Sequence, residues 1–128
     1  MSKSNVDKYD DWSSYISDDD LSLLFKNFVP YNHIVKYFWG NSRECDVLTK
    51  SSIVDLKTYL PNDMLYYGDI MSMANSFEVR FPLIDHKIVE FMTSIDSKWK
   101  IKDGQTKYLM KKLLDGKIPD SIINKKKL

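Results

Sequence analysis

The spacing of apolar residues constrains this chain most, because it changes from a helical period to strict alternation at a single place. In residues 77–81, apolar side chains alternate with charged ones, and a period of two indicates an extended segment with one apolar and one polar face. Elsewhere apolar residues recur three and four positions apart. That spacing predicts helices over 18–27, 31–39, 49–60, 61–74, 86–95, 106–115 and 121–124. The chain is therefore predicted to be mainly α.

Two residues interrupt the helical pattern between positions 49 and 74. Pro61 has a fixed φ that suits the first turn of a helix, so we expect a new helix to begin there. Gly68 lies inside that helix at a cost of about 1 kcal/mol relative to alanine. It is explained either by close packing of a neighbouring segment or by simple tolerance. Residues 1–17 are polar and show no clear period, so we expect this stretch to be partly disordered in isolation.

Charge is distributed unevenly along the chain. The net charge of the 128 residues is +1, which gives no overall preference for nucleic acid or for an anionic membrane. The last 33 residues, 96–128, nevertheless carry ten lysines against four aspartates. These lysines form either a solvated surface or a region that holds phosphates. We expect neither a nucleic-acid partner nor a membrane partner.

Several classes of protein are excluded by residue content. A single cysteine, Cys45, rules out an internal disulfide framework and fits a reducing compartment. No apolar run approaches the roughly 20 residues of a membrane span, so we expect a soluble, cytoplasmic protein. Two histidines, His33 and His86, cannot build a zinc site with one cysteine, and we expect no metal centre made by this chain alone. The four glycines are scattered and form no phosphate-binding loop.

Four stretches of the second half form the most specific pattern in the sequence. Residues 55–65 read D-L-K-T-Y-L-P-N-D-M-L, and residues 69–85 read D-I-M-S-M-A-N-S-F-E-V-R-F-P-L-I-D. Residues 104–114 read G-Q-T-K-Y-L-M-K-K-L-L, and residues 119–123 read P-D-S-I-I. In composition and spacing these stretches resemble the C-terminal part of the synthetase domain of glutamine-hydrolysing asparagine synthetases, over roughly residues 50–128.

The resemblance implies a fold and a reaction. The synthetase domain of that family is an α/β, adenine-nucleotide-hydrolase-like (ATP-pyrophosphatase) domain, of which this chain would supply the helical C-terminal part. ATP and Mg²⁺ activate aspartate as β-aspartyl-AMP, and ammonia released from glutamine then forms asparagine. The resemblance divides the chain into a variable, partly helical segment, 1–45, and an incomplete synthetase segment, 46–128.

Other motifs of that family are absent from this sequence. Neither S-G-G-x-D-S nor S-G-E-G-x-D-E occurs, and Ser2 stands where the glutaminase nucleophile would be cysteine. We therefore expect the chain to be inactive alone. Its expected partner is the missing N-terminal portion of the synthetase, or a separate subunit that carries it, and the substrates would be aspartate, ATP and glutamine-derived ammonia.

One candidate catalytic residue follows from the resemblance. The family's R-x-K-x-G-F stretch aligns so that its lysine, which stabilises negative charge on phosphates and intermediate, matches Lys127. The chain stops at Leu128, before the expected Gly-Phe, which we interpret as truncation. Residues expected to line the site or support its wall are Asp69, Ser72, Glu78, Arg80 and Asp85. Side chains two apart on an extended segment point the same way, so Glu78 and Arg80 can reach one site. We interpret them as supports, in a structural ion pair that could include Asp85, and not as reagents.

Two alternatives stay open. One is another acyl-adenylating, amide-forming relative, of the β-lactam synthetase or lasso-peptide cyclase type, with a different acid and nucleophile. The other is a non-catalytic helical remnant or interaction module that binds through its basic end.

Overall fold

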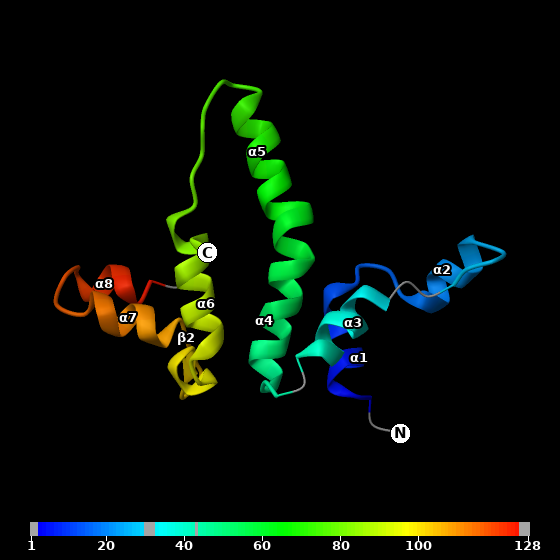
Figure 1. The fold of residues 1–128 in the computed structure, drawn as a ribbon, viewed down its shortest axis with the longest axis horizontal. Helices are drawn as coiled ribbons and strands as arrows, with labels where there is room; N and C mark the ends of the chain where they lie inside the picture. Colours follow the sequence, from blue (N-terminus) through cyan, green and yellow to red (C-terminus); the bar gives the residue numbers. More distant parts are fainter. Residues whose placement is uncertain (1–2, 30–32, 43, 126–128) are drawn as a thin grey trace. The chain divides into compact units, whose positions relative to one another are not determined.

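The computed structural model describes residues 3–29, 33–42 and 44–125 (Figure 1). Its contacts divide the chain into two units, Met1–His86 and Lys87–Leu128. The described residues are mainly helical, which confirms the predicted fold class. The elements of the first unit are α1 (Asn5–Ser13), α2 (Asp18–Leu24), α3 (His33–Asn41), α4 (Val47–Lys57), the π-helical η1 (Leu60–Leu65), α5 (Tyr66–Met73) and the 3-10 turn η2 (Pro82–Ile84).

Side chains fix where the first helices begin. The Asp7 amide donates to Ser4 Oγ at 3.3 Å, and the Ser4 hydroxyl donates to the Asp7 carboxylate at 2.5 Å. Asp46 caps α4 in a similar way, by accepting from the Thr49 amide at 3.0 Å. Such caps satisfy amide groups that have no partner within the helix. No helix was predicted within 1–17, because α1 is signalled by its Ser-x-x-Asp start and not by an apolar period.

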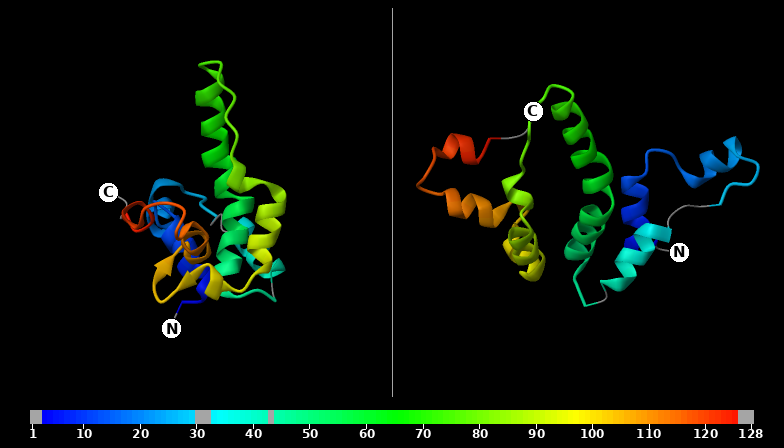
Figure 2. Two further views of the ribbon diagram at one scale, coloured as in Figure 1. Left: turned by 90° about the vertical axis from the view of Figure 1, so that its left-hand side faces the viewer. Right: turned by 45° about the horizontal axis from the view of Figure 1, so that its top comes forward.

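Helices α4, η1 and α5 follow one another as one column (Figures 1 and 2). The new helix begins close to the predicted position: α4 ends at Lys57, and η1 starts at Leu60 with Pro61 in its first turn. Proline lacks an amide hydrogen and clashes with the preceding turn of an α-helix, and the chain is π-helical over the six residues that include Pro61. A π-helical turn within a longer helical run is a rare but recognised local irregularity, often a single wider turn.

A small core lies where α1 and α3 pack near α4. Within the described part of the chain, Tyr9 and Val54 are the buried hydrophobic residues. The Tyr9 ring lies 5.7 Å from the Trp39 ring, centroid to centroid, and joins α1 to α3. Contacts of α3 with both α1 and α4 complete this packing. The first unit therefore buries few apolar side chains.

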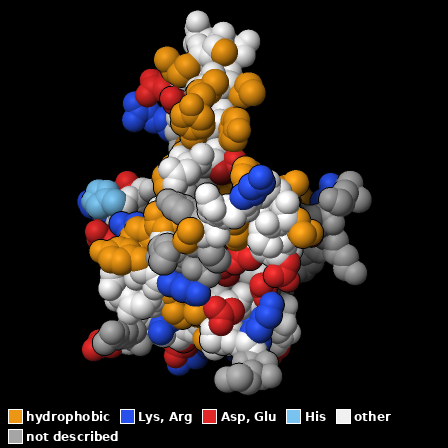
Figure 3. All heavy atoms as spheres, turned by 90° about the vertical axis from the view of Figure 1, so that its right-hand side faces the viewer, with side chains coloured by type: hydrophobic (Ala, Val, Ile, Leu, Met, Phe, Trp, Pro, Cys, Tyr) orange, Lys and Arg blue, Asp and Glu red, His pale blue; other side chains and the backbone are white. Residues whose placement is uncertain are grey.

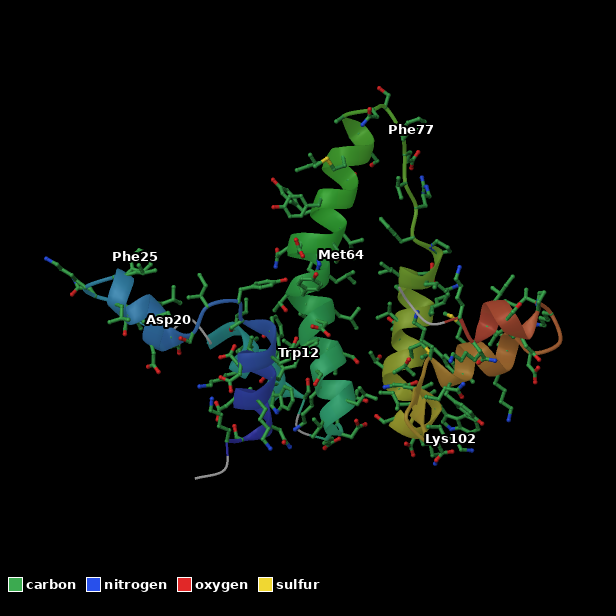
Figure 4. The ribbon with its side chains drawn as sticks, turned by 180° about the vertical axis from the view of Figure 1, so that it is seen from behind. Trp12, Asp20, Phe25, Met64, Phe77 and Lys102 are labelled. Carbon is green, nitrogen blue, oxygen red and sulfur yellow. The ribbon has the colours of Figure 1, made fainter. Side chains whose placement is uncertain are left out.

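The segment 77–81 is extended, as predicted, and its residues are exposed. It leaves the end of α5 through Ser76, whose φ is 58°, and the Phe77 amide donates to the Ser72 carbonyl at 2.9 Å. The predicted burial of its apolar face is wrong for this chain, because Phe77 is 68% and Val79 49% exposed. Figure 4 labels Phe77 beside the end of α5.

The second unit holds a β-hairpin that the sequence did not predict. Its elements are α6 (His86–Ser94, whose first residue closes the first unit), the 3-10 turn η3 (Ser97–Trp99), β1 (Ile101–Lys102), β2 (Gln105–Thr106), α7 (Tyr108–Leu114) and α8 (Asp120–Ile123). The two strands are antiparallel, with Ile101 opposite Thr106. Asp103 and Gly104 both have positive φ, the conformation that an Asp-Gly hairpin turn requires.

Candidate functional site

Two of the predicted site residues, Asp69 and Ser72, lie one turn apart on α5. The Ser72 hydroxyl donates to the Asp69 carbonyl at 3.0 Å, and the Ser72 carbonyl accepts from the amides of Asn75 and Phe77. Ser72 therefore organises the end of α5 and the start of the extended segment. This geometry fits the predicted supporting role for Ser72, which stays a prediction.

Glu78 and Arg80 form an ion pair on the extended segment. Both side chains are well exposed, 71% for Glu78 and 83% for Arg80. The expectation that residues two apart on this segment can pair is confirmed. An exposed pair of this kind contributes about 0–1 kcal/mol to stability, so it organises charge on this face more than it stabilises the chain.

The remaining predicted residues are Asp85 and Lys127. Asp85 immediately precedes α6, and its carboxylate lies 3.9 Å from Nδ1 of His86. Lys127 lies outside the described residues, so its catalytic role stays a prediction.

An open groove of about 840 Å³ in the first unit was missed by sequence reasoning. None of the five described site residues above lines it. Figure 4 labels two residues on its walls, Trp12 on α1 and Met64 on η1. Its main apolar side chains are Tyr9, Trp12, Tyr15, Leu56, Leu60 and Met64. We call this the apolar groove.

Two aspartates, Asp55 and Asp63, line the apolar groove, and each accepts a hydrogen bond from a tyrosine. The Tyr9 hydroxyl donates to Asp55 Oδ1 at 2.5 Å, which joins α1 to α4 across 46 positions of sequence. Burial of the ring, helped by this hydrogen bond, raises the pKa of Tyr9 well above its usual value. A hydrogen bond to the Asp63 carboxylate raises the pKa of the exposed Tyr59 as well.

The sequence contained one signal for this groove. Asp55, Leu60 and Asp63 belong to the stretch 55–65 that carried the family resemblance. The opposite wall, from α1, has no such pattern, so its proximity to that stretch was not predictable from spacing.

The described residues do not fit a complete site for ATP and Mg²⁺. No group of three or more histidine, cysteine or acidic side chains in this part of the chain could hold a metal ion. The sequence also lacks the glycine-rich loop that usually cradles phosphates. The described part of the chain holds no helix with the length and apolarity needed to cross a bilayer.

Comparisons with known proteins place the chain in a family. The family model described as asparagine synthase matches residues 3–128. Glutamine-hydrolyzing asparagine synthetase 1 of Bacillus subtilis is 34% identical over 108 residues, which cover 82% of this chain and 17% of that protein. Asparagine synthetase 3 of the same organism is 42% identical over 65 residues, or 51% of this chain and 11% of that protein.

A putative asparagine synthetase of Mycobacterium bovis is 29% identical over 90 residues, or 70% of this chain and 14% of that protein. No solved structure matches the chain. The chain thus spans less than a fifth of the length of these curated relatives. Because the family model matches nearly the whole chain, this protein belongs to the asparagine synthase family.

Proposed function

We propose that this chain forms a helical part of a synthetase that makes asparagine from aspartate, ATP and ammonia derived from glutamine. The match of residues 3–128 to the asparagine synthase family carries the proposal. The printed names of its bacterial relatives, glutamine-hydrolyzing asparagine synthetases, support the choice of reaction. A cytoplasmic location is part of the same proposal and is supported by the single cysteine.

The exposed apolar side chains support a role as part of a larger assembly. Phe77 and Leu83 are 68% and 61% exposed, and Met71 on α5 is 64% exposed. Figure 3 shows such side chains, in orange, on the projecting end of the helical column. Several large apolar side chains exposed on one segment are typical of an interface with another part of a protein. We propose that the rest of the synthetase domain covers it and supplies the nucleotide-binding loops.

In this proposal the chain contributes residues that support one side of the active site, and one positively charged side chain, Lys127. Asp69 and Ser72 hold the end of α5, from which the extended segment starts. The ion pair of Glu78 and Arg80 keeps two opposite charges fixed on that segment. Lys127 supplies positive charge to the phosphates, as a point charge on a flexible stem does.

A chimera tests the proposal. The region of Bacillus subtilis asparagine synthetase 1 that matches this chain is replaced by the 128 residues, and AMP and asparagine are measured with aspartate, ATP and free ammonia. We expect both products from the chimera. We expect neither from the same synthetase without that region nor from the 128-residue chain alone.

Two outcomes would refute parts of the proposal. A chimera that is monodisperse and helical by circular dichroism but forms no asparagine would favour a non-catalytic module. AMP formation with another acid, and none with aspartate, would favour a different acyl-adenylating relative. AMP release by the 128 residues alone would disprove that the chain needs a complement.

A further inference from the structure

A second, acidic depression of the first unit borders the apolar groove at one residue. This second depression, of about 390 Å³, shares Ser14 with the apolar groove. It lies between α1 and the start of α2, and Asp10, Asp11, Asp18 and Asp19 line it.

The combined surface has a strong excess of negative charge. Among the described residues that line it, the acidic side chains are Asp10, Asp11, Asp18, Asp19, Asp55 and Asp63. The basic side chain among them is Lys3, and its Nζ lies 2.7 Å from Asp11 Oδ2. That lysine is already matched by its neighbour, so the other carboxylates set the potential of the surface.

Two aromatic side chains of the apolar groove, Trp12 and Tyr15, lie close in sequence to Ser14, which lines both depressions. Trp12 is 80% exposed and Tyr15 is 99% exposed, although both line the apolar groove. Tryptophan and tyrosine are the residues that most often dominate binding energy at protein interfaces. Their exposure beside an open groove leaves a large apolar area that an entering side chain would cover.

We propose that the apolar groove and the acidic depression together bind a segment of another polypeptide that presents apolar side chains next to lysine or arginine. The apolar side chains enter between Trp12 and Met64, and the basic ones face Asp10 and Asp19. Anionic ligands are disfavoured, because the acidic depression repels them. The proposal goes beyond asparagine formation, since it needs none of the predicted site residues.

Binding of two short peptides to the full 128-residue chain tests the proposal. One is an amphipathic helix of leucine and lysine, and the other has glutamate in place of every lysine. Each carries fluorescein, and its anisotropy is followed as the chain is added. We expect the leucine–lysine peptide to bind about tenfold or more tightly than its acidic counterpart, and high salt to weaken its binding by screening the carboxylates.

Variants locate the binding surface. Trp12→Ala and, separately, Tyr15→Ala should each weaken binding of the leucine–lysine peptide about tenfold. Asp10→Asn/Asp19→Asn should weaken it and reduce its salt dependence. The control Asp103→Asn/Asp115→Asn removes the same charge from the second unit and should leave affinity unchanged.

The proposal is overturned if neither peptide binds, or if both bind equally. It is also overturned if the aromatic and acidic variants bind like the unaltered chain while circular dichroism shows that they keep their helix content. Tyr15 is almost fully exposed, so Tyr15→Ala remains a usable test even where Trp12→Ala loses structure.

Discussion

The ring of Phe81 lies against Gly68, so that a Cβ added at Gly68 would stand 3.3 Å from Phe81 Cζ. This glycine lets the extended segment return close beside α5. Of the two explanations offered by the sequence, close packing is therefore the one that the structure confirms. Phe81 is still 43% exposed, which leaves the ring room to move away from α5.

Substitutions at Gly68 should separate helix propensity from this packing. Alanine improves helix propensity by about 1 kcal/mol but pushes the Phe81 ring outward, so we expect a net stability change smaller than that. Gly68→Leu should displace the ring and speed hydrogen exchange of the amides in 77–81. The same leucine in a Phe81→Ala background should cause little further change. Unaltered exchange in Gly68→Leu would show that the contact does not hold the segment.

The hydrogen bond from Tyr9 to Asp55 should contribute to stability, because the Tyr9 ring is buried. Tyr9→Phe removes the hydroxyl while keeping the ring, and should lower the free energy of unfolding by about 1–3 kcal/mol. Urea denaturation measures this change. Tyr37→Phe is the matched control, since Tyr37 is 63% exposed, and should change stability little. Equal effects of the two substitutions would contradict the prediction.

The raised pKa of Tyr9 predicts how stability depends on alkaline pH. Burial, followed by the hydrogen bond to Asp55, keeps Tyr9 protonated in the folded chain at pH values where it ionises in the unfolded chain. The folded state then binds more protons, so the free energy of unfolding falls as pH rises above the usual tyrosine pKa of about 10. Tyr9→Phe should show a smaller fall between pH 9 and roughly pH 11. An identical fall in both proteins would exclude this contribution.

Most of the helices could be predicted from apolar spacing. Helix α1 and the β-hairpin could not, because they are signalled by capping and turn residues. The helix at α1 was missed because its start depends on Ser4 and Asp7 and its inner face on one buried tyrosine, Tyr9. The hairpin of β1 and β2 was missed because each strand has two residues, too short for any period. The Asp103-Gly104 pair was its one readable signal.

The apolar face of 77–81 shows that a sequence period does not predict whether a segment is buried in the chain itself. Alternation correctly predicted an extended segment, yet the side chains of Phe77 and Val79 are exposed. A sequence period reports which side of a segment prefers to be buried, and does not report what buries it. The apolar groove depends similarly on the distant residues Tyr9 and Asp55, whose meeting no local pattern encodes.

Charge exchange should reveal whether Glu78 and Arg80 act only as a pair. In the 128-residue chain, Arg80→Ala should change the free energy of unfolding by less than about 1 kcal/mol, since the pair is exposed. In the chimera we expect Arg80→Ala to lower asparagine formation. Glu78→Arg/Arg80→Glu, which restores an ion pair with reversed order, should recover most of that activity. Failure of the exchange to rescue activity would mean that one of the two charges acts on a substrate.

Lys127 is the sharpest test of the catalytic part of the proposal. If its ammonium group stabilises charge on the phosphates, Lys127→Ala in the chimera should lower turnover by about 10²–10³-fold, as loss of one well-placed charge-stabilising group does. Lys126→Ala removes a neighbouring positive charge and serves as the matched control, with turnover expected to stay close to that of the unaltered chimera. The asparagine formation rate at saturating ATP and aspartate is the measurement. Equal, small losses for both alanine variants would assign these lysines to a solvated basic surface, and no residue of this chain would then have a proposed catalytic role.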